Sequence, residues 1–182
     1  MLHLALALVV PGLFVRSGYA ASLCLRRYYR TGGDLALYFL DTSALVKLYV
    51  QEPGTDQLLP LVSDQPDNRF AVLAIAVVEV RSAIRRRQRA GDIDASVAAT
   101  ILESVQHHLE TRFIRQAIND TVIDTALEMV DRYALRAYDA VQLAGCLVLC
   151  MISAEAFTFV CSDRRLLEAA RSEQLKVLDP VA

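Results

Sequence analysis

The 182-residue sequence lacks the patterns that mark several classes of protein. It contains no tryptophan, and none of its four cysteines belongs to a CxxC pair, which argues against a disulfide-stapled secreted scaffold. Its three histidines do not have HExxH spacing, so no zinc site is predicted. Walker A, GxGxxG and GxSxG patterns are also missing, which argues against triphosphate, dinucleotide and serine-hydrolase sites.

The few cysteines and histidines have simple structural interpretations. We expect the four cysteines to be small buried side chains in a reducing compartment, which indicates the cytoplasm; they are Cys24, Cys146, Cys150 and Cys161. The adjacent pair His107-His108 is expected to lie exposed on a helix.

Acidic side chains are missing from the start of the chain. Residues 1–33 hold four arginines and no acid, whereas the remainder has 15 basic and 21 acidic side chains. The net charge of -2 therefore averages a +4 segment with a -6 domain, and a protein that binds nucleic acid by bulk positive charge is excluded.

The first 15 residues are apolar, but Pro11-Gly12 interrupts them and they are shorter than a membrane-spanning helix, so no membrane association is predicted. The small residues around Tyr19 resemble a signal-peptidase site, yet no basic residue precedes the apolar run. We favour the alternative that residues 1–34 are an extension outside the working protein, produced by a mis-set translation start, and that the domain spans 35–182.

From residue 35 onward, short apolar runs alternate with helical patterns, which predicts an α/β fold with a central parallel sheet of about five strands. Strands are expected at 37–40, 70–73, 112–114, 158–161 and 176–178. Helices are expected at 44–50, 55–62, 76–90, 95–110, 121–132, 140–153 and 164–172. Asp120 is the expected N-cap of the fifth helix.

Four acids fall where such a sheet binds ligands, outside the carboxyl ends of its strands. Asp41 and Asp163 each follow a predicted strand, Glu79 lies in the first turn of a predicted helix, and Asp139 begins the most apolar helix. Neither Glu79 nor Asp139 has an interleaved cation, and an unpaired buried carboxylate is costly. The missing positive charge suggests a bound metal ion.

Each acid also has a purely structural interpretation. Asp139 with Gln142 fits an N-cap and its partner, Asp163 fits the cap of the last helix, and Asp41 fits the start of a turn. Glu79 suits the positive end of a helix. Four independent caps would not need to gather at one edge of the sheet, so their conjunction favours a site.

The sequence around these acids resembles the PIN-domain ribonucleases, and within them the toxins of VapBC toxin-antitoxin pairs. The matching stretches are FLDTSALVKLY at 39–49, VEVRSA at 78–83, LRAYDAVQLA at 135–144 and FVCSDRRLL at 159–167. Their order and spacing agree at four separate places. The resemblance implies a three-layer α/β/α domain that cuts RNA with Mg²⁺ or Mn²⁺ and a VapB-type antitoxin as partner. The high apolar content of 54% points to an association interface, and a homodimer is expected.

The resemblance also assigns roles to residues. Asp41, Glu79 and Asp139 match the three principal acids of the family, and Asp163 matches a more variable fourth. Ser43 matches a hydroxyl that positions a carboxylate or a water. Family members often have Thr or Ser two residues before the fourth acid, where this chain has a cysteine, so the role of Asp163 is the least determined.

The expected chemistry follows from these assignments. Hard divalent cations take oxygen ligands. Asp41 and Asp139 are expected to bind the ion directly, Glu79 to bind it or orient the attacking water, and Asp163 to hold a second ion or an outer-shell water. Two alternatives stay open. A haloacid-dehalogenase-type phosphatase would need a second Asp at position 43, and an inert PIN scaffold would act only by binding protein.

A basic stripe runs along the helix that carries Glu79. Arg81, Arg85 and Arg89 recur every four residues, and arginine suits bidentate phosphate contacts. These side chains are candidates for contact with RNA or the antitoxin, or else form a solvated helix face.

Overall fold

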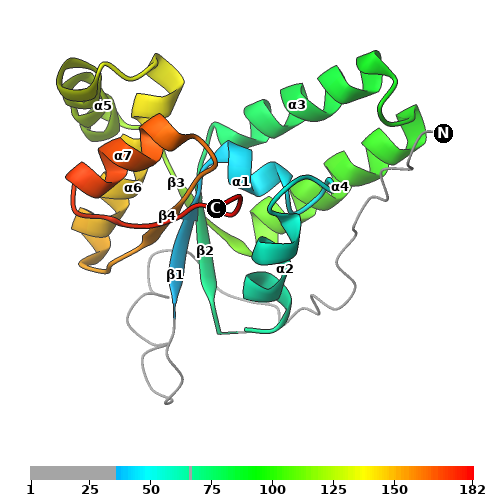
Figure 1. Cartoon of the computed structure of the whole chain (residues 1–182), viewed down its shortest axis with the longest axis horizontal. Coiled ribbons are helices and arrows are strands. Elements are labelled where there is room, and N and C mark those ends of the chain that lie inside the picture. Colours follow the sequence, from blue (N-terminus) through cyan, green and yellow to red (C-terminus); the bar gives the residue numbers. More distant parts are fainter. Residues whose placement is uncertain (1–35, 66) are drawn as a thin grey trace.

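The computed structural model describes residues 36–65 and 67–182, and its centre is a sheet of five parallel strands (Figure 1). The order across the sheet is β3-β2-β1-β4-β5. The strands are β1 (Leu37–Leu40), β2 (Arg69–Leu73), β3 (Phe113–Gln116), β4 (Thr158–Val160) and β5 (Lys176–Leu178). The predicted parallel α/β architecture is confirmed.

Among the described residues, seven helices cover the two faces of the sheet, which gives three layers (Figure 1). One face is covered by α1 (Thr42–Val46), α2 (Thr55–Ser63), α3 (Ala76–Ala90) and α4 (Ala95–Thr111). The other is covered by α5 (Asp120–Tyr133), α6 (Ala137–Ser153) and α7 (Arg164–Ser172). Both faces are buried, which explains why the strands lack polar alternation.

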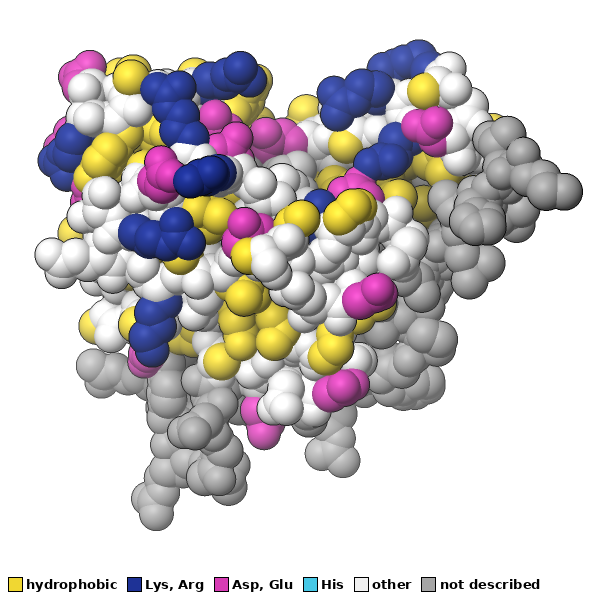
Figure 2. Space-filling view, viewed as in Figure 1, with side chains coloured by type: hydrophobic (Ala, Val, Ile, Leu, Met, Phe, Trp, Pro, Cys, Tyr) yellow, Lys and Arg dark blue, Asp and Glu magenta, His cyan; other side chains and the backbone are white. Residues whose placement is uncertain are grey.

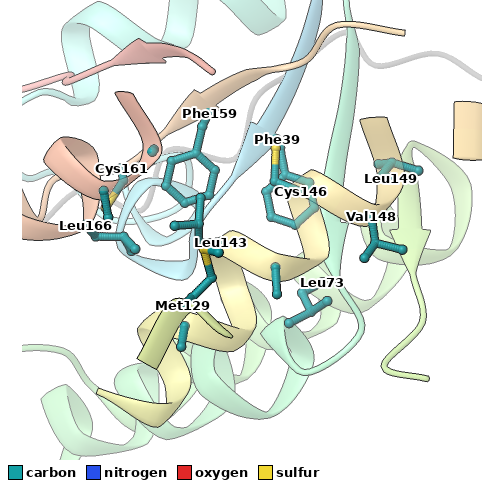
Figure 3. Packing of buried hydrophobic residues seen from close by; sticks show 14 of the residues in the cluster. Phe39, Leu73, Met129, Leu143, Cys146, Val148, Leu149, Phe159, Cys161 and Leu166 are labelled. Carbon is teal, nitrogen blue, oxygen red and sulfur yellow. The ribbon is translucent and has the colours of Figure 1, made fainter. Parts of the chain in front are cut away.

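Alternate side chains of each strand enter two separate cores. In β1, Leu37 and Phe39 pack against α5, α6 and α7, whereas Leu40 packs against the helices of the opposite layer. The rings of Phe39 and Phe159 stack with their centroids 6.0 Å apart (Figure 3). This period of two fixes which face of the sheet each helix covers.

The strand order places the topological switch of the sheet between β1 and β4, because β2 and β3 extend the sheet on one side of β1 and β4 and β5 on the other. Ligands of open parallel sheets bind at the carboxyl ends of the strands beside such a switch. The ends of β1 and β4 lead directly into Asp41 and the segment 161–163.

Several predicted boundaries are wrong by a few residues. The first helix spans Thr42–Val46 rather than 44–50, and its early start is explained by the Asp41 side chain, which caps it. Asn119, not Asp120, caps α5, with its side chain accepting a hydrogen bond from the Val122 amide. The third strand is displaced from 112–114 to 113–116, where it pairs with β2.

The histidine pair is only partly exposed. His107 faces solvent, but His108 is half-buried and its Nδ1 lies 3.0 Å from the hydroxyl of Tyr49. Cys146 and Cys161 are buried as predicted, and Cys150 is partly exposed. Cys24 and the whole predicted extension 1–34 lie outside the described residues. Across the part of the chain that the structure describes, no helix combines the length and apolar character needed to cross a bilayer.

Candidate active site

Asp41 sits at the carboxyl end of β1 with only 8% of its surface exposed. Its backbone amide donates to the carbonyl of Val160, which ties it to the end of β4 at 3.0 Å. Its Oδ2 accepts the amide hydrogen of Ser43 at 3.0 Å and so caps α1. The predicted turn role of Asp41 is therefore real, and Oδ1 is left without a hydrogen bond from the described residues.

Ser43 and Cys161 connect Asp41 to Asp163. The hydroxyl of Ser43 accepts the amide hydrogen of Ser162 at 3.1 Å, and the thiol of Cys161 lies 3.6 Å from Oδ2 of Asp41. The amide of Asp163 donates to the same sulfur at 3.1 Å. The cysteine that departs from the family pattern thus occupies a buried position between two of the acids.

Asp163 has the capping role that was one of its two interpretations. Its Oδ1 accepts the amide hydrogen of Leu166 at 2.9 Å, at the N-terminus of α7. The residue is exposed, and its charge still acts on Asp139. Capping and membership of the acidic group are therefore compatible.

Glu79 lies in the first turn of α3 and is held by two side chains from other helices. The hydroxyl of Thr42 donates to its Oε2 at 2.6 Å, and Nε2 of Gln142 donates to the same oxygen at 2.7 Å. Nε2 of Gln142 also donates to the hydroxyl of Thr42 at 3.0 Å. Sequence reasoning missed both partners, although Thr42 follows Asp41 directly and Gln142 is polar within an apolar helix.

Asp139 does not cap its helix. The N-cap of α6 is Arg136, which makes no capping hydrogen bond through its side chain, and Asp139 lies inside the first turn. Gln142 bonds to Glu79 rather than to the helix start, so the interpretation of Asp139 and Gln142 as a capping pair is wrong. The carboxylate of Asp139 is free for another role.

The pKa values of Glu79 and Asp139 are both raised, in part by the charges of neighbouring acids. Partial burial raises the pKa of Glu79, and the charges of Asp41 and Asp139 add to this, while the hydrogen bonds from Thr42 and Gln142 lower it. Burial likewise raises the pKa of Asp139, and the charges of Asp163 and Asp41 add to this, while the charges of Arg136 and Arg165 lower it. The structure thus brings all four predicted acids into one electrostatic group.

The donor chemistry of this group fits a hard divalent cation. All four side chains are carboxylates, and none of them forms an ion pair with any described residue. Within 36–65 and 67–182, no three Asp, Glu, His or Cys side chains close around one point. Mg²⁺ typically keeps several waters and needs only one or two carboxylates, so an open set of acids suits it.

A cleft of about 850 Å³ opens beside the acids. Glu79 and Ser43 lie in its wall, together with the exposed side chains of Val78 and Tyr138. Figure 2 shows a notch between the α5–α7 side and the arm formed by α3 and α4, with acidic side chains gathered at the notch and Lys and Arg on both sides.

The arginines that line this cleft are not those of the predicted stripe. Arg86 and Arg87 lie in its wall, and Arg87 pairs with Glu52, which also binds Lys47 at 3.0 Å. Arg81 and Arg85 instead line a separate groove against α4. Arg89 is exposed and lines neither.

Comparison with known proteins identifies the family of this chain. The family profile of the PIN domain matches residues 38–172. Ribonuclease VapC35 of Mycobacterium tuberculosis is 33% identical over 144 residues, which cover 79% of this chain and 97% of that protein.

Solved structures share the fold at lower identity. PAE2754 from Pyrobaculum aerophilum superposes with a TM-score of 0.53 at 21% identity, covering 84% of this chain and 90% of that one. VapBC2 from Rickettsia felis, bound to a DNA fragment from its promoter, gives 0.54 at 12% identity, covering 79% and 98%. A toxin-antitoxin complex from Klebsiella pneumoniae gives 0.54 at 15% identity, covering 79% and 97%.

Proposed function

The chain belongs to the PIN-domain family, as a VapC-type member, and on that premise we propose that it is a Mg²⁺- or Mn²⁺-dependent endoribonuclease, the toxin of a type II toxin-antitoxin pair. One observation carries the catalytic part of the proposal. Four carboxylates that form no ion pair with any described residue lie within electrostatic reach of one another near the switch point of the sheet, and Glu79 lines an open cleft. Such an arrangement is costly unless positive charge is supplied from outside the chain.

Each acid has a proposed role in binding the cation or a water. Asp41 and Asp139 would hold the cation, Glu79 would hold it or orient the attacking water, and Asp163 would hold an outer-shell water or a second ion. When bound, the cation supplies an activated water and neutralises charge on the departing oxygen. Ser43 supports the geometry, because it joins the end of β4 to the start of α1.

The cleft supports a single-stranded nucleic acid as the substrate. Arginine contacts the phosphate backbone, and exposed aromatic rings stack on unpaired bases. Arg86 and Tyr138 both line the cleft that contains Glu79. Arg81, Arg85 and Arg89 lie outside this cleft and are better placed to meet the antitoxin.

Asp41→Asn tests the enzyme directly. Asparagine caps helices as well as aspartate does, so α1 and the fold should be retained. Removing the carboxylate should lower metal-dependent cleavage of RNA by at least about 100-fold. The measurement is cleavage of a mixed RNA pool with Mg²⁺, Mn²⁺ or EDTA, with circular dichroism as the check on folding. Undiminished cleavage by the folded variant would refute the site.

The inert-scaffold alternative makes the opposite prediction in the same assay. A scaffold would bind its partner and leave RNA intact with every metal. No feature of the described residues favours that alternative, since the four acids match the family pattern.

The proposed partners are a VapB-type antitoxin and a second copy of the chain. Ribonuclease VapC35 is named as a VapC protein, and the Rickettsia and Klebsiella structures are toxin-antitoxin assemblies. Ile123 and Leu127 lie one turn apart on α5 with exposed side chains, which offers apolar surface for association. Light scattering on the purified chain, alone and co-expressed with the product of any small open reading frame found next to its gene, measures both associations.

A further inference from the structure

Gln142 is the polar exception on the buried face of α6. The other buried residues of this helix are apolar, yet Gln142 is only 2% exposed. Burying an amide is unfavourable unless its hydrogen-bonding groups are used. Its role therefore lies in the bonds that it makes.

The amide of Gln142 is oriented by two acceptors. Nε2 donates to Oε2 of Glu79 at 2.7 Å and to the hydroxyl of Thr42 at 3.0 Å. Oε1 of Gln142 is buried and has no hydrogen-bond partner among the described residues. Turning the amide over would place Oε1 against the Glu79 carboxylate, so the donors keep their orientation even though one acceptor is left unsatisfied.

The two carboxylate oxygens of Glu79 differ in their hydrogen bonding. Oε2 receives one hydrogen bond from Thr42 and one from Gln142. Oε1 receives none from the described residues, and Glu79 lies in the wall of the cleft. One oxygen is held by the protein and the other is left for a ligand.

We propose that Gln142 is a positioning residue that holds Glu79 through Oε2 and so presents Oε1 to a divalent cation. The inference rests on the proposed function, in which these acids bind the cation. Gln142 does not touch the ion itself. Groups that orient ligands in this way typically contribute about 10- to 100-fold to metal affinity.

The test measures Mn²⁺ binding by electron paramagnetic resonance in the absence of RNA. The four proteins are the wild-type chain, Gln142→Met, Glu79→Gln and the double variant. Methionine has a similar volume and no donor, so it removes the two hydrogen bonds while keeping the core filled. Gln142→Met should weaken Mn²⁺ binding by about 10- to 100-fold.

The double variant separates positioning from a general structural role. If Gln142 acts through Glu79, adding Gln142→Met to Glu79→Gln should change the Mn²⁺ affinity by less than about twofold. An equal loss in both backgrounds would overturn the inference, because the effect would not pass through Glu79. Circular dichroism checks folding. Gln142→Leu is a second apolar variant, and it should weaken Mn²⁺ binding as Gln142→Met does.

Thr42 supplies a matched control on the other donor to Oε2. Thr42→Ser keeps the hydroxyl and should bind Mn²⁺ as the wild-type chain does, whereas Thr42→Val should lose affinity. If the wild-type chain binds no Mn²⁺, the proposed metal site and this inference both fail. If the wild-type chain binds Mn²⁺ and both Gln142 variants bind it as tightly, only this inference fails.

Discussion

Arg86 and Arg81 line different grooves because they project from different sides of α3. Seven residues are about two helical turns, so Arg86 lies on the same side of the helix as Glu79. Arg81 is two residues from Glu79 and therefore lies on nearly the opposite side. The lining of the two grooves agrees with this geometry, since Arg86 lies beside the acids and Arg81 faces α4.

A paired substitution tests whether the Arg86 side of α3 binds RNA. Arg86→Gln should weaken the binding of single-stranded RNA and reduce the dependence of log K on log salt by about 0.7, the value for one phosphate contact. Arg81→Gln removes the same charge from the opposite side and should change both quantities less. Fluorescence anisotropy in EDTA, over a salt series, measures binding without cleavage. Equal effects of the two variants would show that only net charge matters.

At the scale of elements, the position of α6 depends on a close approach to the sheet. Gly145 packs where a Cβ atom would lie 2.5 Å from Leu73 Cδ1 and 3.4 Å from Phe39 Cζ. Figure 3 shows α6 lying against the side chains of the central strands in this core. Because Asp139 and Gln142 project from the first turns of the same helix, the contact at Gly145 also sets their height above the sheet.

Gly145→Val should therefore destabilise the fold by about 1–3 kcal/mol, the usual cost of overpacking a well-filled core. Urea denaturation measures the change in free energy of unfolding. Met151→Val is the matched control, because it creates the same β-branched side chain at an exposed position of the same helix. Met151→Val should cost less than about 0.7 kcal/mol, which is the range of helix propensity. Valine has a higher helix propensity than glycine, so helix propensity cannot explain a loss in Gly145→Val. Unchanged or increased stability of Gly145→Val would contradict the packing account.

For the molecule as a whole, the acidic site works against stability when no cation is present. The domain is net negative, and its four clustered carboxylates add a local repulsion. Burial together with like charge raises the pKa of Glu79 and of Asp139 above the values expected in the unfolded chain. A group whose folded-state pKa is raised favours folding while protonated and costs stability once it ionises.

The sign of the resulting pH dependence is definite. In EDTA, Asp139→Asn should match the wild-type chain below the unfolded pKa of aspartate, near 3.8, and should become the more stable protein as pH rises through the raised pKa. Urea denaturation from pH 3.5 to 8 measures the difference between the two proteins.

Adding Mg²⁺ or Mn²⁺ should reverse this order near neutral pH. A cation at about 100 times its dissociation constant stabilises the protein that binds it by about 2.7 kcal/mol. An Asp139→Asn variant that gains nothing over the wild-type chain in EDTA at any pH would contradict the electrostatic account of the site.

The order and type of the elements follow from the sequence alone. Unbroken apolar runs with turn residues between them determine a buried parallel sheet, and helical periodicity determines the covering layers. The sequence also singles out the four acids as site candidates, because Asp41 and Asp163 follow strands and Glu79 and Asp139 lie in the first turns of helices that follow the second and third strands. These features depend on neighbouring residues along the chain.

Only the tertiary structure decided which side chains meet. Glu79 bonds to Thr42 and Gln142 across separations of 37 and 63 residues, and no local pattern records such pairings. The pairing depends on how far α3 and α6 slide and rotate against the sheet, which close packing at Gly145 and the buried strand side chains sets. Helix spacing alone places Arg86 on the Glu79 side of α3, but only the tertiary structure shows that this side lines the cleft and that the Arg81 side faces α4. Spacing along a chain fixes neighbours within an element, whereas contacts between elements are fixed by packing.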